Sequence, residues 1–347
     1  MRKYRGRGLS RVMGLLLLLL LSGCSAQQKL PARKTDGKLK IGVSAYDQYD
    51  AFVSELIQDL NDEVLAAKSS ETQDIVLEVY NASQSQSRQN DEVQEMINAD
   101  FDVICVNLVD RTAPTEVINA ARNADVPIIF FNRELVEEDL LRWDKLYYVG
   151  ANAFESGTMQ GELAAEAIQE GRVDRNGDGT IQYTMLEGEA GHQDALARSE
   201  SSVNRLLELG VKLDRLSYAI ANWNRAQAKT QMDKFIKQYG TGIELVLANN
   251  DEMALGAIDA YEASDIPERD WPLIYGIDGT EAGLSAVRSG KMEATVYNDA
   301  RGQAEAIFQL AQHLALDEPL SALPLTNDKY IRLPYQKVTS DNVWTFR

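Results

Sequence analysis

Oxygen-bearing side chains recur at a fixed spacing in the stretch Asp-Arg-Asn-Gly-Asp-Gly-Thr-Ile-Gln, residues 174–182. They occupy the first, third, fifth and ninth positions, with glycine at the sixth and an apolar residue at the eighth. Calcium prefers oxygen ligands, and the glycine of an EF-hand loop permits the sharp turn that directs those oxygens inward. The pattern therefore predicts a calcium-binding loop.

The loop lacks the last ligand of an EF-hand. Its twelfth position, where a bidentate glutamate is expected, is Met185, and residues 182–186 have the pattern of a strand instead of an exit helix. A calcium site here needs a carboxylate from elsewhere in the chain. The alternative is a solvated acidic turn, because Asp, Asn and Gly are common turn residues. The number of matched positions favours calcium.

A second group of polar side chains follows this strand directly. A glycine-rich turn at residues 188–191 leads into a helical pattern that carries His192, Asp194 and Arg198 in its first turns. Asp194 and Arg198 are four residues apart and share a helical face. Open α/β sheets bind ligands at the carboxyl ends of their strands, so the group predicts a polar binding site. An N-capping aspartate with a surface ion pair is the alternative.

The amino terminus has the pattern of a secretory leader. Five basic residues precede seven leucines at 15–21, and the apolar run is far shorter than the ~20 residues of a membrane-spanning helix. The leader ends Leu-Ser-Gly-Cys, which resembles a bacterial lipobox. Residues 1–23 are therefore predicted to be a signal peptide, Cys24 the lipid-modified first residue of the mature chain, and residues 24–38 a tether to the membrane.

Charge and cysteine content narrow the class of partner. Loss of residues 1–23 removes five of the 35 basic residues and none of the 53 acidic ones, which moves the net charge from −18 to −23. Nucleic acids and anionic lipid head groups repel such a chain. With Cys24 lipidated, Cys105 has no partner for a disulfide, and its apolar neighbours predict a small core residue.

From residue 39 onward, short apolar runs alternate with amphipathic helical patterns. The alternation predicts parallel sheets covered by helices on both faces. It restarts after Gly150, and the ~320 residues beyond the leader exceed one typical domain. The fold class is therefore predicted to be α/β, with two doubly wound lobes. A closing strand is predicted over residues 330–338.

Hydrogen-bonding or aromatic side chains follow nearly every predicted strand. They are Asp50, Phe52, Asn132, His192, Asp194, Trp223, Asn250, Asp278 and Asn298. Any one of them can be a turn or capping residue. The full set, drawn from both lobes, suits a neutral polyhydroxylated ligand, since carboxylates and amides bind hydroxyls and flat rings cover apolar C–H faces.

From about Lys40 to the carboxyl terminus, the chain resembles the galactose/glucose-binding proteins of bacterial ABC sugar transporters, a branch of the type I periplasmic binding proteins. The resemblance lies in several short motifs. They are Ile-Gly-Val at 41–43, Gln-Asn-Asp at 89–91, Ile-Cys-Val-Asn-Leu-Val-Asp at 104–110, Phe-Phe-Asn at 130–132, Tyr-Tyr-Val-Gly at 147–150, Gly-Glu-Ala-Gly-His at 188–192, Ala-Asn-Asn-Asp at 248–251 and Asn-Asp-Ala at 298–300. The ribose- and arabinose-binding relatives share the fold without the calcium loop.

The resemblance implies a role for each site residue. The sugar ligands would be Asp50, Asn132, His192, Asp194, Arg198, Asn250, Asp278 and Asn298, with Phe52 and Trp223 as stacking rings. The calcium ligands would be Asp174, Asn176, Asp178, Thr180 through its carbonyl, Gln182 and the distant Glu244. Glu244 would supply the carboxylate that the loop lacks.

The resemblance also implies a hinge of three crossovers near residues 150–151, 298–299 and 332–333. The N-terminal lobe would span 39–150 and 299–332, and the C-terminal lobe 151–298 and 333–347. The expected function is capture of D-galactose or D-glucose by a monomeric, calcium-containing, lipid-anchored protein outside the cytoplasm, with no enzymatic activity. An ABC transporter permease is the expected partner, and nucleic acid is excluded.

Two departures from the family stand near the site: Gln193 where proline is common and Ala51 where asparagine is common. Neither is expected to affect hydroxyl recognition. The lipobox is the larger departure, because it implies tethering instead of free diffusion.

Three alternatives remain. The protein could be a sugar-sensing lipoprotein that signals to a membrane receptor or kinase. It could be a glycoside-processing enzyme, since Asp50, Asp194 and Asp278 could include a catalytic carboxylate pair. The chain has no nucleophile elbow, P-loop or Rossmann glycine fingerprint. A ligand-sensing domain of a transcriptional regulator shares the fold, but the leader stands where a helix-turn-helix would be expected.

The lipobox makes a prediction that can be tested alone. Cys24→Ala should leave the chain without its lipid, so that the protein no longer fractionates with membranes and no longer needs detergent for extraction. Recovery of the wild-type protein wholly in the aqueous fraction outside the cell would contradict the anchor.

Overall fold

The structure is a computed structural model that describes residues 38–70 and 74–346. The predicted leader at 1–23, Cys24 and all of the predicted tether except Lys38 lie outside the described residues. Among the described helices, none combines the length and apolarity that a membrane crossing requires.

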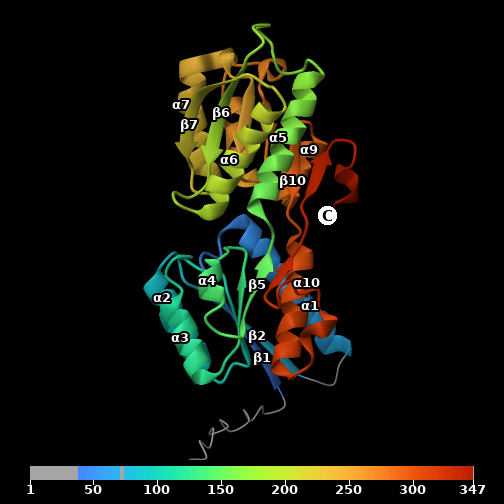
Figure 1. Ribbon diagram of the computed structural model, residues 1–347. Coiled ribbons are helices and arrows are strands. Elements are labelled where there is room, and N and C mark those ends of the chain that lie inside the picture. The colour runs from blue at the N-terminus through green and yellow to red at the C-terminus, as the bar shows by residue number, and fades with distance from the viewer. Residues whose placement is uncertain (1–37, 71–73, 347) are drawn as a thin grey trace, which may run out of the picture. The chain divides into compact units, whose positions relative to one another are not determined.

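The described chain builds two six-stranded sheets (Figure 1). The first has the order β11-β5-β4-β3-β1-β2, and all its neighbouring strands are parallel. Its strands are β1 (Lys38–Ala45), β2 (Asp74–Asn81), β3 (Val103–Val106), β4 (Ile128–Phe131), β5 (Leu146–Gly150) and β11 (Tyr330–Arg332). Its helices are α1 (Ala51–Ser70), α2 (Gln86–Asn98), α3 (Thr115–Ala124), α4 (Glu137–Leu140) and α10 (Ala300–Ala315). We call this sheet with its helices the N-terminal lobe.

The second sheet repeats the plan in the order β12-β10-β9-β8-β6-β7. Only its edge strand β12 is antiparallel to its neighbour. Its strands are β6 (Ile181–Glu187), β7 (Leu213–Ile220), β8 (Leu245–Ala248), β9 (Leu273–Tyr275), β10 (Ala294–Tyr297) and β12 (Gln336–Thr339). Its helices are α5 (Ala153–Gln169), α6 (Gln193–Glu208), α7 (Arg225–Tyr239), α8 (Asp251–Glu262) and α9 (Glu281–Arg288). This is the C-terminal lobe.

Four short 3₁₀ helices complete the described elements. They are η1 (Gly240–Gly242), η2 (Glu268–Asp270), η3 (Leu320–Ala322) and η4 (Val343–Thr345).

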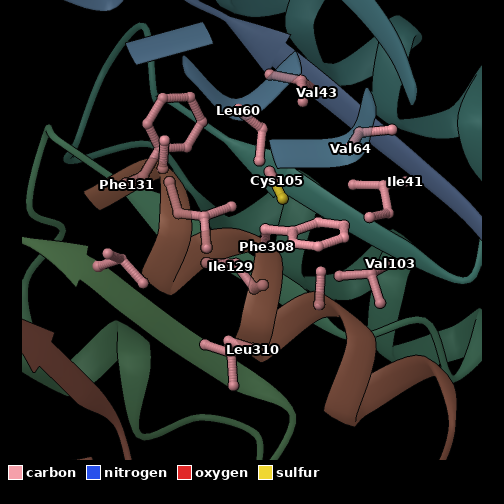
Figure 2. Close-up of a cluster of buried hydrophobic side chains, with 14 of the residues drawn as sticks. Ile41, Val43, Leu60, Val64, Val103, Cys105, Ile129, Phe131, Phe308 and Leu310 are labelled. Carbon is pink, nitrogen blue, oxygen red and sulfur yellow. The ribbon is translucent and has the colours of Figure 1, made fainter. Parts of the chain in front are cut away.

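Apolar residues on both faces of the central strands explain why helices cover both sides. All four residues of β3, Val-Ile-Cys-Val, are buried, as parallel strands packed on both faces require. On one face the strand side chains pack against α1 and α10 (Figure 2), and on the other against α2 and α3. Cys105 lies in the first of these clusters as predicted, and burial raises the pKa of its thiol to about 12.

The chain passes between the sheets three times: from β5 to α5, from β10 to α10 and from β11 to β12. Two doubly wound lobes with a hinge of three crossovers confirm the predicted fold class. The single strand predicted over 330–338 is wrong in one respect. Residues 330–332 join the first sheet and 336–339 the second, and Pro334 between them has no N–H to continue a ladder.

Parallel strands place all their carboxyl ends at one edge of a sheet, and the residues that follow these strands gather there. The loops after β1 and β4 in the N-terminal lobe, and after β6, β7, β8 and β9 in the C-terminal lobe, therefore carry the candidate site.

Candidate functional site

Side chains from both lobes line a cavity. The lining residues are Tyr46, Asp50, Phe52, Asn132, Arg133, His192, Asp194, Arg198, Trp223, Asn250 and Asp278. The structure thus brings together every predicted sugar ligand except Asn298.

Asn298 lies at the second crossover and does not line the cavity. It is 4% exposed, and its side-chain oxygen accepts a hydrogen bond of 2.7 Å from Gln303 Nε2. Its backbone N–H donates to the carbonyl of Asp278. In this structure Asn298 therefore ties the start of α10 to the loop that carries Asp278.

A buried ion pair forms part of the cavity wall. Arg198 on α6 reaches Asp278 with an Nη1–Oδ1 distance of 3.3 Å, and both side chains are about 95% buried. Arg198 also donates to the Asn249 carbonyl at 2.7 Å and to the Tyr335 hydroxyl at 3.2 Å. Burial raises the pKa of the Asp278 carboxyl, and the Arg198 charge opposes that rise. Arg198 pairs with Asp278 and not with its helical neighbour Asp194.

One donor of this arginine remains unused. The Nε atom of Arg198 is fully buried and has no hydrogen-bond partner among the described residues. Buried donors in folded proteins are almost always paired, so one that lacks a partner in a cavity wall needs an explanation. An oxygen of a bound ligand would satisfy it.

The ring nitrogens of His192 have distinct roles. Nδ1 accepts the backbone N–H of Asp194 at 3.1 Å and caps α6. Burial, with the nearby cations Arg133 and Arg198, lowers the pKa of His192 well below its usual value. The imidazole is therefore neutral, its proton is on Nε2, and that group is left to donate into the cavity.

Asp50, Asn132 and Asp194 supply further polar groups to the cavity wall. Asp50 accepts from Val53 N at 2.9 Å and from the Tyr46 hydroxyl at 2.7 Å. The Asn132 oxygen accepts from Asn107, which leaves its amide N–H groups to donate. Burial chiefly raises the pKa of Asp194, against the effect of Arg198. The lining residues thus include both acceptors and donors.

Asn250 and Trp223 are held by each other. Asn250 caps α8 through its oxygen, which accepts from Met253 N at 2.9 Å. Its amide nitrogen donates to the Trp223 carbonyl at 3.3 Å. The indole ring packs edge-on against His192, with ring centroids 5.2 Å apart. A Cβ on Gly188 would come within 2.2 Å of the indole, so only glycine leaves room for it.

Backbone conformation singles out three of the lining residues. Asn132, Trp223 and Asp278 have φ angles of 59°, 61° and 120°, although none of them is glycine. Such conformations cost free energy of order 1–3 kcal/mol each and concentrate at functional sites. The fold therefore holds these three side chains in orientations that an unstrained turn would not provide.

Two lining residues, Tyr46 and Arg133, were not predicted. Arg133 directly follows Asn132, so the rule that selected polar residues after strands could have found it. Tyr46 directly follows the last residue of β1. The Arg133 guanidinium stacks on its ring, with the Arg133 Cζ atom 3.6 Å from the Tyr46 ring centroid. Their side chains are 7% or less exposed.

The predicted calcium loop is closed by its own side chains. Asp174 accepts the backbone N–H groups of Gly177 and Gly179 at 2.8 and 3.0 Å. Asn176 accepts from Asp178 N, and Asp178 from Thr180 N, both at 2.8 Å. Gly179, the glycine at loop position six, has a φ of 74°, which the sharp turn requires.

Glu244 is the residue immediately before β8 and contacts this loop from a distant part of the chain. It is 2% exposed, and its two oxygens accept backbone N–H groups of the loop. Oε1 accepts from Arg175 at 2.7 Å and from Asn176 at 3.3 Å, and Oε2 accepts from Gln182 at 3.1 Å. The structure therefore places this carboxylate beside the loop that lacks one.

Half of the six predicted calcium ligands are carboxylates and half are neutral. Within the described residues, no three His, Cys, Asp or Glu side chains are grouped so that they could hold a metal by themselves. The amide oxygens of Asn176 and Gln182 and the Thr180 carbonyl would have to complete the set. Oxygen-only ligands of mixed charge fit calcium and are a poor fit for zinc or copper.

Comparison with known proteins identifies the family. The sequence profile of the periplasmic binding protein domain matches residues 41–319, more than half of the chain. The chain belongs to the periplasmic binding protein family. This family comprises solute-binding proteins that work outside the cytoplasm.

Similar proteins with known ligands support the assignment. The periplasmic binding protein described here is 32% identical over 315 residues to the D-galactose/methyl-galactoside binding periplasmic protein MglB of Haemophilus influenzae, which covers 88% of this chain and 91% of that protein. It is 28% identical to the ribose import binding protein RbsB of Bacillus subtilis, over 87% of this chain and 90% of the relative.

Solved structures agree on the fold. An ABC transporter solute binding protein from Bacillus halodurans C-125 with bound myo-inositol superposes with a TM-score of 0.75 at 28% identity, covering 90% of this chain and 98% of that one. A periplasmic solute binding protein from Actinobacillus succinogenes with bound D-allose gives a TM-score of 0.75 at 21% identity, covering 89% of this chain and 100% of that one. The two-lobed α/β fold of this periplasmic binding protein is therefore that of its family.

Proposed function

We propose that this protein captures D-galactose or D-glucose in the cavity between its lobes and delivers the sugar to the permease of an ABC importer. The cavity wall carries the proposal: a buried arginine with an unused Nε–H lies among carboxylates, amides and the aromatic rings of Tyr46, Phe52 and Trp223. Relatives of 28–32% identity are named for galactose and ribose, both polyhydroxylated.

The chemistry of the wall suits a neutral hexose. Arg198 and the Nε2–H of His192 would donate to sugar oxygens, while Asp50, Asp194 and Asp278 would accept from hydroxyls. Phe52 and Trp223 would cover the apolar C–H faces of the ring. Two arginines among three aspartates leave little net charge for an ionic ligand, so recognition depends on the positions of the hydroxyls.

Binding by both lobes implies closure around the ligand. Asp50, Phe52 and Asn132 belong to the N-terminal lobe, and His192, Arg198 and Asp278 to the C-terminal lobe. A sugar that contacts both sets favours the closed state by its greater affinity for that state. No step of this function breaks a covalent bond, so the protein acts as a receptor and not as an enzyme.

The proposal includes the location and state of the protein. A lipid on Cys24 would hold a monomer at the outer face of the cell membrane, where it can reach a permease. The sensing alternative, in which the same closure signals to a membrane receptor or kinase, would use the same cavity.

We further propose that the loop at 174–182 binds calcium with Glu244, and that the ion stabilises the C-terminal lobe. Asp174, Asn176, Asp178, Gln182 and the Thr180 carbonyl would complete the ligand set. None of these residues lines the sugar cavity. Calcium would neutralise the buried Glu244 carboxylate and bind only the folded chain, so it would raise stability by mass action.

Chelation tests the calcium site. At a free concentration 100 times its dissociation constant, calcium would add about 2.7 kcal/mol to the free energy of unfolding. The melting temperature should rise by several degrees with calcium and fall with chelator. Glu244→Ala should abolish this difference, whereas Glu208→Ala, at the exposed end of α6, should keep it. Identical melting curves with calcium and with chelator would mean that the loop is only a solvated acidic turn.

Titration calorimetry tests the ligand. The wild-type protein should bind galactose or glucose in the presence of calcium, and ribose far more weakly, because a smaller sugar leaves buried polar groups unpaired. A hydrogen bond to a charged group contributes about 1.5–3 kcal/mol. Asp278→Ala should therefore weaken binding about ten- to a hundredfold. Trp223→Ala should weaken it as well, through lost stacking.

Matched controls lie outside the cavity. Asp259→Ala removes a carboxylate that pairs with Arg225 on the same lobe, and Trp344→Ala removes a ring that is 72% exposed. Both should bind sugar as the wild type does. Failure of the wild type to bind either hexose, or turnover of a glycoside by the protein, would overturn the proposed function.

A further inference from the structure

Arg133 is a cation held inside the N-terminal lobe. It follows β4, its side chain is 5% exposed, and its Nη1 donates to the Val109 carbonyl at 2.8 Å. Its guanidinium lies 3.6 Å from the centroid of the Tyr46 ring. One carbonyl and one aromatic face fix the side chain, but neither neutralises its charge.

The neutralising carboxylate comes from the other lobe. Glu189, in the loop after β6, accepts from Arg133 Nη2 at 2.6 Å, and its side chain is 44% exposed. Each of the other ion pairs in residues 38–70 and 74–346 joins two residues of one lobe. In the part of the chain that the structure describes, the charge contact between the lobes is this pair.

The contact continues toward the cavity. The Tyr46 hydroxyl donates to Asp50 Oδ2 at 2.7 Å, and Asp50 Oδ1 accepts from Val53 N at 2.9 Å. Tyr46 and Asp50 both line the cavity, whereas Glu189 lies outside it, in the adjoining part of the cleft. A continuous path of contacts thus runs from Glu189 through Arg133 and Tyr46 to Asp50.

We propose that the Arg133–Glu189 ion pair holds the closed lobes together, and that through Tyr46 it positions the Asp50 carboxylate for the ligand. The inference rests on the proposed function, because it assigns how the same cleft retains its sugar. Glu189 acts without touching the ligand and is a positioning residue.

The ion pair should stabilise the closed conformation of the lobes more than the open one. When the lobes are closed, Arg133 is buried, and without a counter-charge it carries the full cost of burial. When the lobes separate, water can solvate Arg133 and Glu189 separately, so the pair contributes little. It should therefore slow the release of sugar and hardly change its capture.

Two substitutions of Glu189 test the pair. Glu189→Gln keeps the shape and removes the charge, and Glu189→Arg sets two cations against each other. The matched controls are Glu170→Gln and Glu170→Arg. Glu170 is in the same lobe and pairs with Arg172 at 2.8 Å, also within that lobe. The controls change the same charge without touching the other lobe.

Stopped-flow tryptophan fluorescence gives the rates of capture and release. Release of hexose from Glu189→Gln should be faster than from the wild type by roughly 3- to 30-fold. This factor is smaller than for a fully buried pair, because solvent screens the partly exposed carboxylate. Glu189→Arg should release faster still, and capture should change less than about threefold. High salt should narrow the gap between wild type and Glu189→Gln. Release rates of the Glu189 variants equal to those of the Glu170 variants would overturn the inference.

Tyr46→Phe tests the path to Asp50. It keeps the ring under Arg133 and removes the hydrogen bond to the carboxylate. Its effect on release should be smaller in the Glu189→Gln background than in the wild type, because connected contacts are not additive. Strictly additive effects would mean that the pair acts without Asp50, and the positioning part of the inference would be wrong.

A readout without sugar separates this inference from the proposed function. Small-angle scattering of the sugar-free protein at low salt should give a larger radius of gyration for Glu189→Arg than for the wild type, with Glu170→Arg unchanged, because two opposed cations disfavour the closed conformations that the sugar-free protein samples. If the wild type binds no hexose, the proposed function fails and scattering decides on the ion pair. If hexose binds but neither release nor scattering distinguishes Glu189→Arg from Glu170→Arg, the function stands and the ion pair has no such role.

Discussion

The ion pair between Arg198 and Asp278 constrains the site more than any other contact. Both side chains are almost fully buried, and burial of a guanidinium costs free energy unless its donors find acceptors in fixed directions. Asp278, the Asn249 carbonyl and the Tyr335 hydroxyl supply three such acceptors. The Nε–H of Arg198 has no hydrogen-bond partner among the described residues. An oxygen of the proposed ligand would pair with this donor.

The doubly wound topology makes this arrangement possible. The three acceptors come from the loops after β8 and β9 and from the chain that leads into β12, which are far apart in sequence and meet at one edge of the second sheet. The first sheet presents its own loops in the same way. Three crossovers connect the lobes, so the two halves of the site belong to separately packed bodies. Such a construction can form a complete site only when both halves meet, which makes retention of the ligand depend on contacts such as that between Arg133 and Glu189.

Much of this organisation could be predicted from the sequence, because strand–helix alternation and polar residues after strands have direct physical causes. The sequence could not reveal that residues 330–338 divide between two sheets, since the division depends on which strand edges are free. The sequence also could not show that the Asn298 side chain is hydrogen-bonded to Gln303, because a buried amide and a ligand-binding amide look alike in sequence. Arg133 directly follows Asn132 and fits the rule for polar residues after strands, but the sequence does not show that this arginine is buried against Tyr46.

In the proposed function, a hexose closes the two lobes around Arg198 and Asp278. Small-angle X-ray scattering of the wild-type protein in calcium, with and without saturating galactose or glucose, tests it most directly. Closure of the lobes predicts a smaller radius of gyration and a shorter maximum dimension with the hexose, and no such change with ribose at the same concentration. Identical scattering curves under conditions where calorimetry shows the hexose bound would contradict closure around the ligand.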